Sequence, residues 1–120
     1  MKKIKKQTLE EVLSTIAIVA ATNPMGFTYN INEDKMQTTG YAVALSATQN
    51  SFGADGFLKV VEYARKHNIE CIGGWLDSEI GKFYFDATVI VDDLETAKDL
   101  GRYNKQIAIF DLANLQEITL

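Results

Sequence analysis

The chain has 120 residues, a formal net charge of −4 and a hydrophobic content of 47%. We expect one domain over residues 1–120, because a chain of this length buries roughly two thirds of its unfolded surface and forms a core without metal or disulfides. The acidic balance argues against polymeric nucleic acid as a partner, since that needs a broad basic surface, but it allows a small anionic ligand. Cys71 is the single cysteine, which excludes an intramolecular disulfide and fits a reducing cytoplasm.

The N-terminal stretch places basic residues before an apolar segment, as a signal peptide does. Glu10 and Glu11 interrupt that segment, and its apolar residues recur at the spacing of a helix face. Thr8 and Glu11 also fit a capping box. We therefore predict a mobile basic arm over 1–7 and an amphipathic helix over 9–21. Its wide apolar face allows cover on two sides, and another subunit is one candidate for the second side. No apolar run reaches the ~18 residues that span a membrane, so no membrane partner is expected.

Strand pairs and helices alternate along the rest of the chain. Alternating aromatic and polar residues predict a strand over 26–31, and small apolar residues predict a second strand over 40–47 that pairs with the first. Short turns separate the strands of each pair, which favours antiparallel pairing. The order α-ββ-α-ββ-α-ββ predicts an α+β fold with three helices on one face of a largely antiparallel sheet. The later elements are expected at 54–67, 69–76, 82–91, 92–104, 106–111 and 117–120.

Two features of the predicted strands are typical of ligand sites. The polar loop 48–51 leads into the helix at 54–67, whose free N–H groups and positive dipole end suit phosphate or another anion. The alternative is that Asn50 and Ser51 only cap the helix. Further on, the pair Gly73–Gly74 predicts a β-bulge or the close approach of a bulky group, which can be a ligand.

Aromatic residues near the turns are candidates for stacking on a nucleobase, a contact worth roughly 1–3 kcal/mol. For Phe83 and Phe85 the alternative is core packing, because alternate strand positions must fill the interior. The two arginines, Arg65 and Arg102, lie at helix ends, where they either offset the helix dipole or bind a pyrophosphate. The aromatic candidates are Phe52, Trp75, Phe83, Tyr84, Phe85 and Tyr103.

Catalysis has weak support in the sequence. His67 and Cys71 lie four positions apart but lack an evident third group to orient them, so a helix-capping histidine and a buried cysteine are favoured. Neither a P-loop, nor a dinucleotide-binding motif, nor a nucleophile elbow occurs. We expect a protein without enzymatic activity, metal or cofactor.

Three segments carry a resemblance to a known family: TGYAVALSATQNSFG, GGWLDSEIGKFYFDA and LGRYNKQIAIFDLANLQEI. Together they resemble the first type of Thoeris anti-defence protein, over about residues 25–118. The resemblance implies a phage-encoded sponge in the cytoplasm of the infected bacterium, which holds a cyclic ADP-ribose isomer uncleaved so that the immune effector stays inactive. It also implies a homodimer, which can build a hexamer, and in some members a separate site for cyclic trinucleotides.

A sponge needs only base stacking, phosphate capture and ribose hydrogen bonds. We expect Phe83 or Phe85 to stack on adenine, and Asn50 with Ser51 to bind phosphate or ribose. A rival hypothesis is a protein-interaction module of a phage or mobile element, which has an exposed apolar patch and no nucleotide-sized pocket. The remaining ligand-binding candidates are Phe52, Trp75, Arg102, Asn104 and Gln106.

Overall fold

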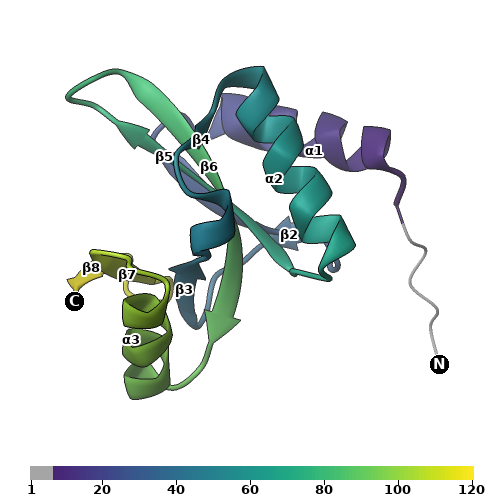
Figure 1. Cartoon of the computed structure of the whole chain (residues 1–120). Helices are drawn as coiled ribbons and strands as arrows, with labels where there is room; N and C mark the ends of the chain where they lie inside the picture. Colours follow the sequence, from purple (N-terminus) through teal and green to yellow (C-terminus); the bar gives the residue numbers. More distant parts are fainter. Residues whose placement is uncertain (1–6) are drawn as a thin grey trace, which may run out of the picture.

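The computed structural model describes residues 7–120 and confirms an α+β fold (Figure 1). Three helices occur in this range: α1 (Leu9–Thr22), α2 (Gly53–Lys66) and α3 (Leu94–Tyr103). The predicted arm over 1–7 lies outside the described residues except for Gln7. Of the helices described, none is both long and apolar enough to cross a membrane.

A curled, fully antiparallel sheet accompanies the helices in residues 7–120. Its strand order is β2-β1-β5-β6-β3-β7-β8, and β4 pairs with β6 beside this path. Strand β6 is the longest and lies near the middle. The strands are β1 (Gly26–Asn30), β2 (Lys35–Met36), β3 (Tyr41–Ala44), β4 (Ser51–Phe52), β5 (Cys71–Asp77), β6 (Lys82–Val91), β7 (Ala108–Asp111) and β8 (Gln116–Thr119).

Strand β6 connects all parts of the sheet. One of its edges pairs with β5, and its other edge pairs with β3 at the C-terminal end and with β4 closer to the start. The 3₁₀ helix η1 (Ser46–Thr48) interrupts that second edge. There the buried Thr48 hydroxyl accepts a hydrogen bond from the Ala87 N–H at 2.9 Å, so a side chain replaces the missing ladder partner. The Ala87 N–H is therefore hydrogen-bonded although it lies opposite the gap between β3 and β4.

Two hydrophobic cores lie along β6. Helices α1 and α2 lie near one part of this strand and α3 near its other end (Figure 1). The first is formed by α1, α2, β1, β5 and the first half of β6, with Ile16, Val61 and Ile72 fully buried at its centre. The second joins α3 to β3 and β7 through Val43, Ala97 and Ile109. Odd-numbered residues of β6 contribute to both cores, so the helices cover one face of the sheet, as expected.

The helix ends follow the local sequence signals. Thr8 and Glu11 form the predicted capping box at the start of α1. Asp93 caps α3 by accepting a hydrogen bond from the Thr96 N–H at 2.9 Å. Hydrogen bonds from Thr96 lower the pKa of Asp93. His67 is the C-cap residue of α2, as the sequence favoured. The interpretation of loop 48–51 as a cap is wrong, because the N-cap of α2 is Phe52 and, within the described chain, no side chain caps this helix.

The predicted pairing of segments 26–31 and 40–47 is also wrong. Strand β1 pairs with β2 and β5, whereas β3 pairs with β6 and β7. The first predicted ββ pair is thus a set of four strands, because β2 and β4 are too short to give a sequence signal. Only the second and third strand pairs form the expected hairpins.

The connection from β2 to β3 is short for the distance that it spans across the sheet. It has to cross β1, β5 and β6, about 19 Å in a flat sheet. Residues 37–40 provide five Cα–Cα steps, which span about 18 Å at most. Asn30 donates to the Gln37 side chain at 3.1 Å, and Asn30, Cys71 and Thr88 are buried although they lie on the face away from the helices. The connection therefore covers this part of the opposite face.

The two adjacent glycines of β5 do not form a bulge. The ladder between β5 and β6 continues without interruption from Cys71 to Asp77. A Cβ atom at Gly74 would overlap the Phe27 ring and lie 2.7 Å from the Phe83 ring, and one at Gly73 would lie 2.7 Å from an Asp86 oxygen. The bulky groups that approach these glycines are thus side chains of this chain.

Candidate functional site

The nine candidate residues divide into three groups that occupy different places in the fold. Phe83 and Phe85 lie on the helix face of β6. Phe52 and Trp75 pair with Tyr84 across neighbouring strands, so they lie on the opposite face. The loop residues and the end of α3 form the third group: Asn50, Ser51, Arg102, Asn104 and Gln106. A single small-molecule pocket cannot contain all nine.

The first group borders an apolar cavity of about 420 Å³. The Phe83 and Phe85 rings lie 5.3 Å apart between centroids, and the Phe57 ring lies 4.9 Å from Phe85. Both β6 rings are half-buried, so they pack against the first core and still line the cavity. Core packing and ligand contact are therefore compatible for these two residues. The residues that line this cavity are Ala17, Gly53, Ala54, Phe57, Phe83 and Phe85.

The first turn of α2 forms one wall of this cavity. Gly53 has a φ of 69°, a conformation that favours glycine, and it and Ala54 are exposed. Phe52 gives no side-chain cap, so the N–H groups of this turn have no side-chain acceptor from residues 7–120. Aromatic rings thus adjoin the positive end of a helix dipole, with Asp55 as the acidic residue of the same turn.

Side-chain hydrogen bonds join segment 46–49 to the residues at the C-terminal end of α3, and neither Asn50 nor Ser51 takes part in them. Asn104 is buried, accepts from the Ser46 N–H at 3.0 Å and donates to the Leu100 carbonyl at 3.0 Å. Gln106 donates to the Gln49 side chain at 3.0 Å. Asn104 therefore positions the loop.

The other members of this group differ in how accessible they are. The Ser51 hydroxyl is buried and donates to the Thr48 carbonyl at 2.7 Å, which leaves it turned into the protein. Asn50 is exposed with a φ of 61°. Arg102 is exposed and forms an ion pair with Asp99 at 3.5 Å. Asn50 and Arg102 are thus the accessible polar groups of the set.

An aromatic cluster occupies the opposite face of the sheet. The Trp75 and Tyr84 rings are stacked at 5.0 Å, and the Phe52 ring meets Tyr84 edge-on at 5.9 Å. Lys82 Nζ lies 4.2 Å from the centre of the Phe52 ring. Trp75 and Phe52 are 48% and 47% exposed. Both surfaces are apolar and open to solvent, and they lie on opposite faces of the sheet.

The titratable groups near β5 are poorly suited to nucleophilic catalysis. Burial raises the pKa of Cys71 to about 12, which disfavours the reactive thiolate. The His67 ring lies against Tyr63 at 4.2 Å, at the exposed end of α2. Burial also raises the pKa of Asp86 to about 6, although its hydrogen bond with Thr88 lowers it. Across residues 7–120, no group of three His, Cys, Asp or Glu could hold a metal ion.

No family model, curated protein or solved structure matches the chain. The geometry of the cavity therefore carries the functional interpretation. Four residues that line the cavity were not among the predicted ligand-binding residues. Of these four, only Phe57 could have been recognised from the sequence, because it is an aromatic residue one helical turn after the start of α2. Ala17, Gly53 and Ala54 are small residues without a pattern of their own.

Proposed function

We propose that this protein binds and sequesters a cyclic ADP-ribose isomer without cleaving it, as a phage anti-defence protein in the cytoplasm of the infected bacterium. The observation that carries the proposal is the aromatic cavity bordered by the start of α2. Its volume of about 420 Å³ lies within the ~300–1,000 Å³ typical of small-molecule sites. The resemblance of the sequence to Thoeris anti-defence proteins supplies the ligand class.

Under this proposal the adenine stacks on the accessible faces of the aromatic rings, which already contact one another, and the phosphates meet the helix end. Phe83 and Phe85 contribute stacking of roughly 1–3 kcal/mol per base. The N–H groups near Gly53 and Ala54 face the pyrophosphate, where the helix dipole favours negative charge. Arg102 lies on α3 and is not among the residues that line this cavity, so it takes no part in this binding mode. The ligand leaves unchanged, so no catalytic group is required.

The proposal includes a homodimer, which can assemble into a hexamer, and a separate site for cyclic trinucleotides. Two exposed apolar side chains support the dimer: Ile18 in α1 is 66% exposed and Met25, just after the helix, is 71% exposed.

The direct test is calorimetric titration with a panel of cyclic ADP-ribose isomers and cyclic trinucleotides, followed by chromatography of the ligand released by heat. Tight binding with intact ligand supports sequestration. Recovery of an altered ligand means that the protein is an enzyme, and absence of binding to every compound overturns the proposal.

A cavity-filling variant locates the site. Ala17→Phe adds a ring at the cavity from an exposed position on α1, so it should weaken binding at least tenfold while the thermal unfolding temperature stays unchanged. Ser14→Phe is the matched control, since it adds the same ring one turn earlier on α1 outside the cavity lining. Equal loss in both variants would place the ligand elsewhere.

The rival function is a protein-interaction module, and the exposed cluster of Phe52, Trp75 and Tyr84 favours it. Under this rival, Trp75→Ala abolishes association with a host or phage protein. Under sequestration, the same variant keeps nucleotide affinity, because Trp75 lies on the face opposite the cavity.

A further inference from the structure

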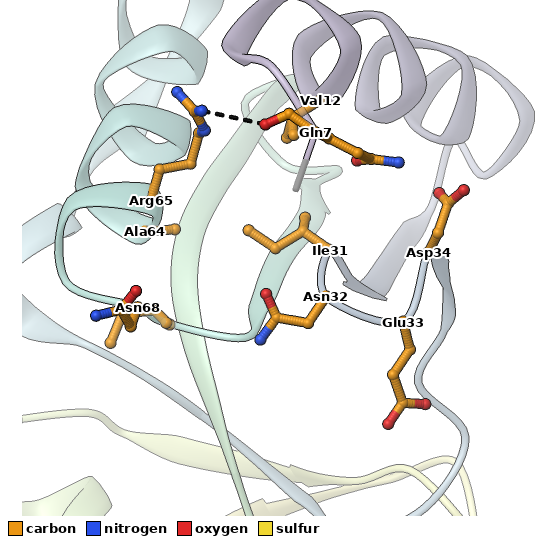
Figure 2. Close-up of a pocket in the computed structure, with 10 residues that line it drawn as sticks. Gln7, Val12, Ile31, Asn32, Glu33, Asp34, Ala64, Arg65 and Asn68 are labelled. Carbon is orange, nitrogen blue, oxygen red and sulfur yellow. Dashed lines mark hydrogen bonds between the residues drawn. The ribbon is translucent and has the colours of Figure 1, made fainter. Parts of the chain in front are cut away.

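A second cavity, of about 320 Å³, lies between the start of α1, the turn from β1 to β2 and the end of α2 (Figure 2). One side is apolar and the other carries polar groups. The volume is at the low end of the range for small-molecule sites. The apolar side includes Val12, Ile31 and Ile69, and the polar side includes Asn32, Arg65 and Asn68.

Arg65 is a half-buried cation that forms no ion pair among residues 7–120. Its Nη2 donates to the backbone carbonyl of Gln7 at 3.2 Å, the contact drawn in Figure 2. The ion pairs found in residues 7–120 are Lys35–Glu33 and Arg102–Asp99, and neither includes Arg65. A guanidinium has five N–H donors, so one contact with a carbonyl leaves capacity for a bidentate partner.

Two acids at the cavity rim are engaged elsewhere. Glu33 pairs with Lys35 at 2.9 Å, and Asp34 accepts from the Tyr29 hydroxyl. Figure 2 shows the Glu33 side chain directed away from Arg65. These acids and the negative end of the α2 dipole still oppose a doubly charged ligand, because Arg65 offers a single positive charge. The charge balance fits a monoanion better than a phosphate dianion.

We propose that this cavity binds a small organic carboxylate with an apolar body. Arg65 holds the carboxylate with paired N–H donors, since the guanidinium fork matches that group. Asn32 and Asn68 provide further amide donors, and Val12, Ile31 and Ile69 contact the apolar part. The site is lined by none of the residues of the aromatic cavity, so it does not depend on cyclic ADP-ribose binding.

Phenylacetate is a suitable probe, with phenylacetamide as its uncharged counterpart and inorganic phosphate as the alternative anion. Nuclear magnetic resonance titration of the full chain follows the Arg65 Nε–H and the side-chain amides of Asn32 and Asn68. We expect saturable shifts with phenylacetate and at least tenfold weaker binding of phenylacetamide, because hydrogen bonds to a charged group are the stronger ones. Equal affinity for the two, or tighter binding of phosphate, would overturn the proposal.

Charge variants identify the residue responsible. Arg65→Gln should weaken phenylacetate binding at least tenfold, whereas Lys66→Gln, the next residue and exposed, removes the same charge from α2 and leaves affinity unchanged. Asn68→Asp provides a second variant, because aspartate tolerates the φ of 55° at this position and adds a repelling charge to the cavity. Unchanged affinity in both Arg65→Gln and Asn68→Asp would refute the assignment, and so would equal losses in Arg65→Gln and Lys66→Gln.

Discussion

Asp86 makes the stability of this protein depend on pH in the direction opposite to most carboxylates. It lies in the middle of β6, half-buried beside Gly73, and burial raises its pKa from 3.8 to about 6. Between these values the folded chain keeps a proton that the unfolded chain releases. The stability that depends on protonated Asp86 is therefore fully present below about pH 4 and is lost as the pH rises through 6.

The size of this effect follows from the pKa shift. One pKa unit corresponds to 1.36 kcal/mol, so a shift from 3.8 to about 6 predicts a loss of about 3 kcal/mol by pH 7.5. Asp86→Asn removes the charge but keeps the oxygen that accepts from the Thr88 hydroxyl. The variant should be more stable than the parent at pH 7.5 by about that amount and similar to it at pH 4.

Urea unfolding of both proteins at pH 4 and pH 7.5 measures the free energies of unfolding. Asp99→Asn is the control, since it removes one carboxylate whose side chain is largely exposed on α3. Other titrating groups affect all three proteins alike, so the informative quantity is the difference between pH profiles. Parallel profiles for Asp86→Asn and the parent would show that burial does not perturb this carboxyl group.

Three further predictions concern buried polar groups. Thr48→Val leaves the Ala87 N–H without an acceptor and should cost about 1–3 kcal/mol of unfolding free energy, while Thr39→Val, at an exposed site, should have little effect. Cys71 should react with iodoacetamide at pH 8 only as fast as the protein unfolds, since it is buried and its pKa is raised to about 12; rapid labelling of the folded chain would contradict this. Burial and Asp34 together raise the pKa of Tyr29 to about 12, so Asp34→Asn should lower it in an ultraviolet difference titration, and an unchanged midpoint would exclude a role for Asp34.

The sequence predicted the elements that have a strong periodic or capping signal. The capping box at Thr8, the alternation of β6 and the final hairpin are all present in the structure. Their signals are local, because each depends on residues within one turn or one strand. Strands β2 and β4 have two residues each, too few for alternation to be recognised.

Pairing between distant strands was harder to predict than the strands themselves. Adjacent strands usually pair, so segments 26–31 and 40–47 were assigned to each other. The structure separates them because residues 37–40 cross the sheet and deliver β3 to the far edge of β6. For the candidate site, the alternation of β6 correctly indicated that Phe83 and Phe85 share a face. Phe52 was grouped with them because its face is fixed by the pairing of β4 with the distant strand β6. The face of Trp75 depends on the register of the β5–β6 hairpin, in which it lies opposite Tyr84.

The position of β6 has a consequence for the order in which the chain can fold during synthesis. Strands β1 to β4 leave the ribosome before β6, but β3 and β4 find their partner only when residues 82–91 have emerged. Until then, the nascent chain exposes apolar strand edges that are prone to associate with other chains. The hairpin of β5 and β6 is local and forms quickly once it is available, so it serves as the template on which the earlier half is assembled.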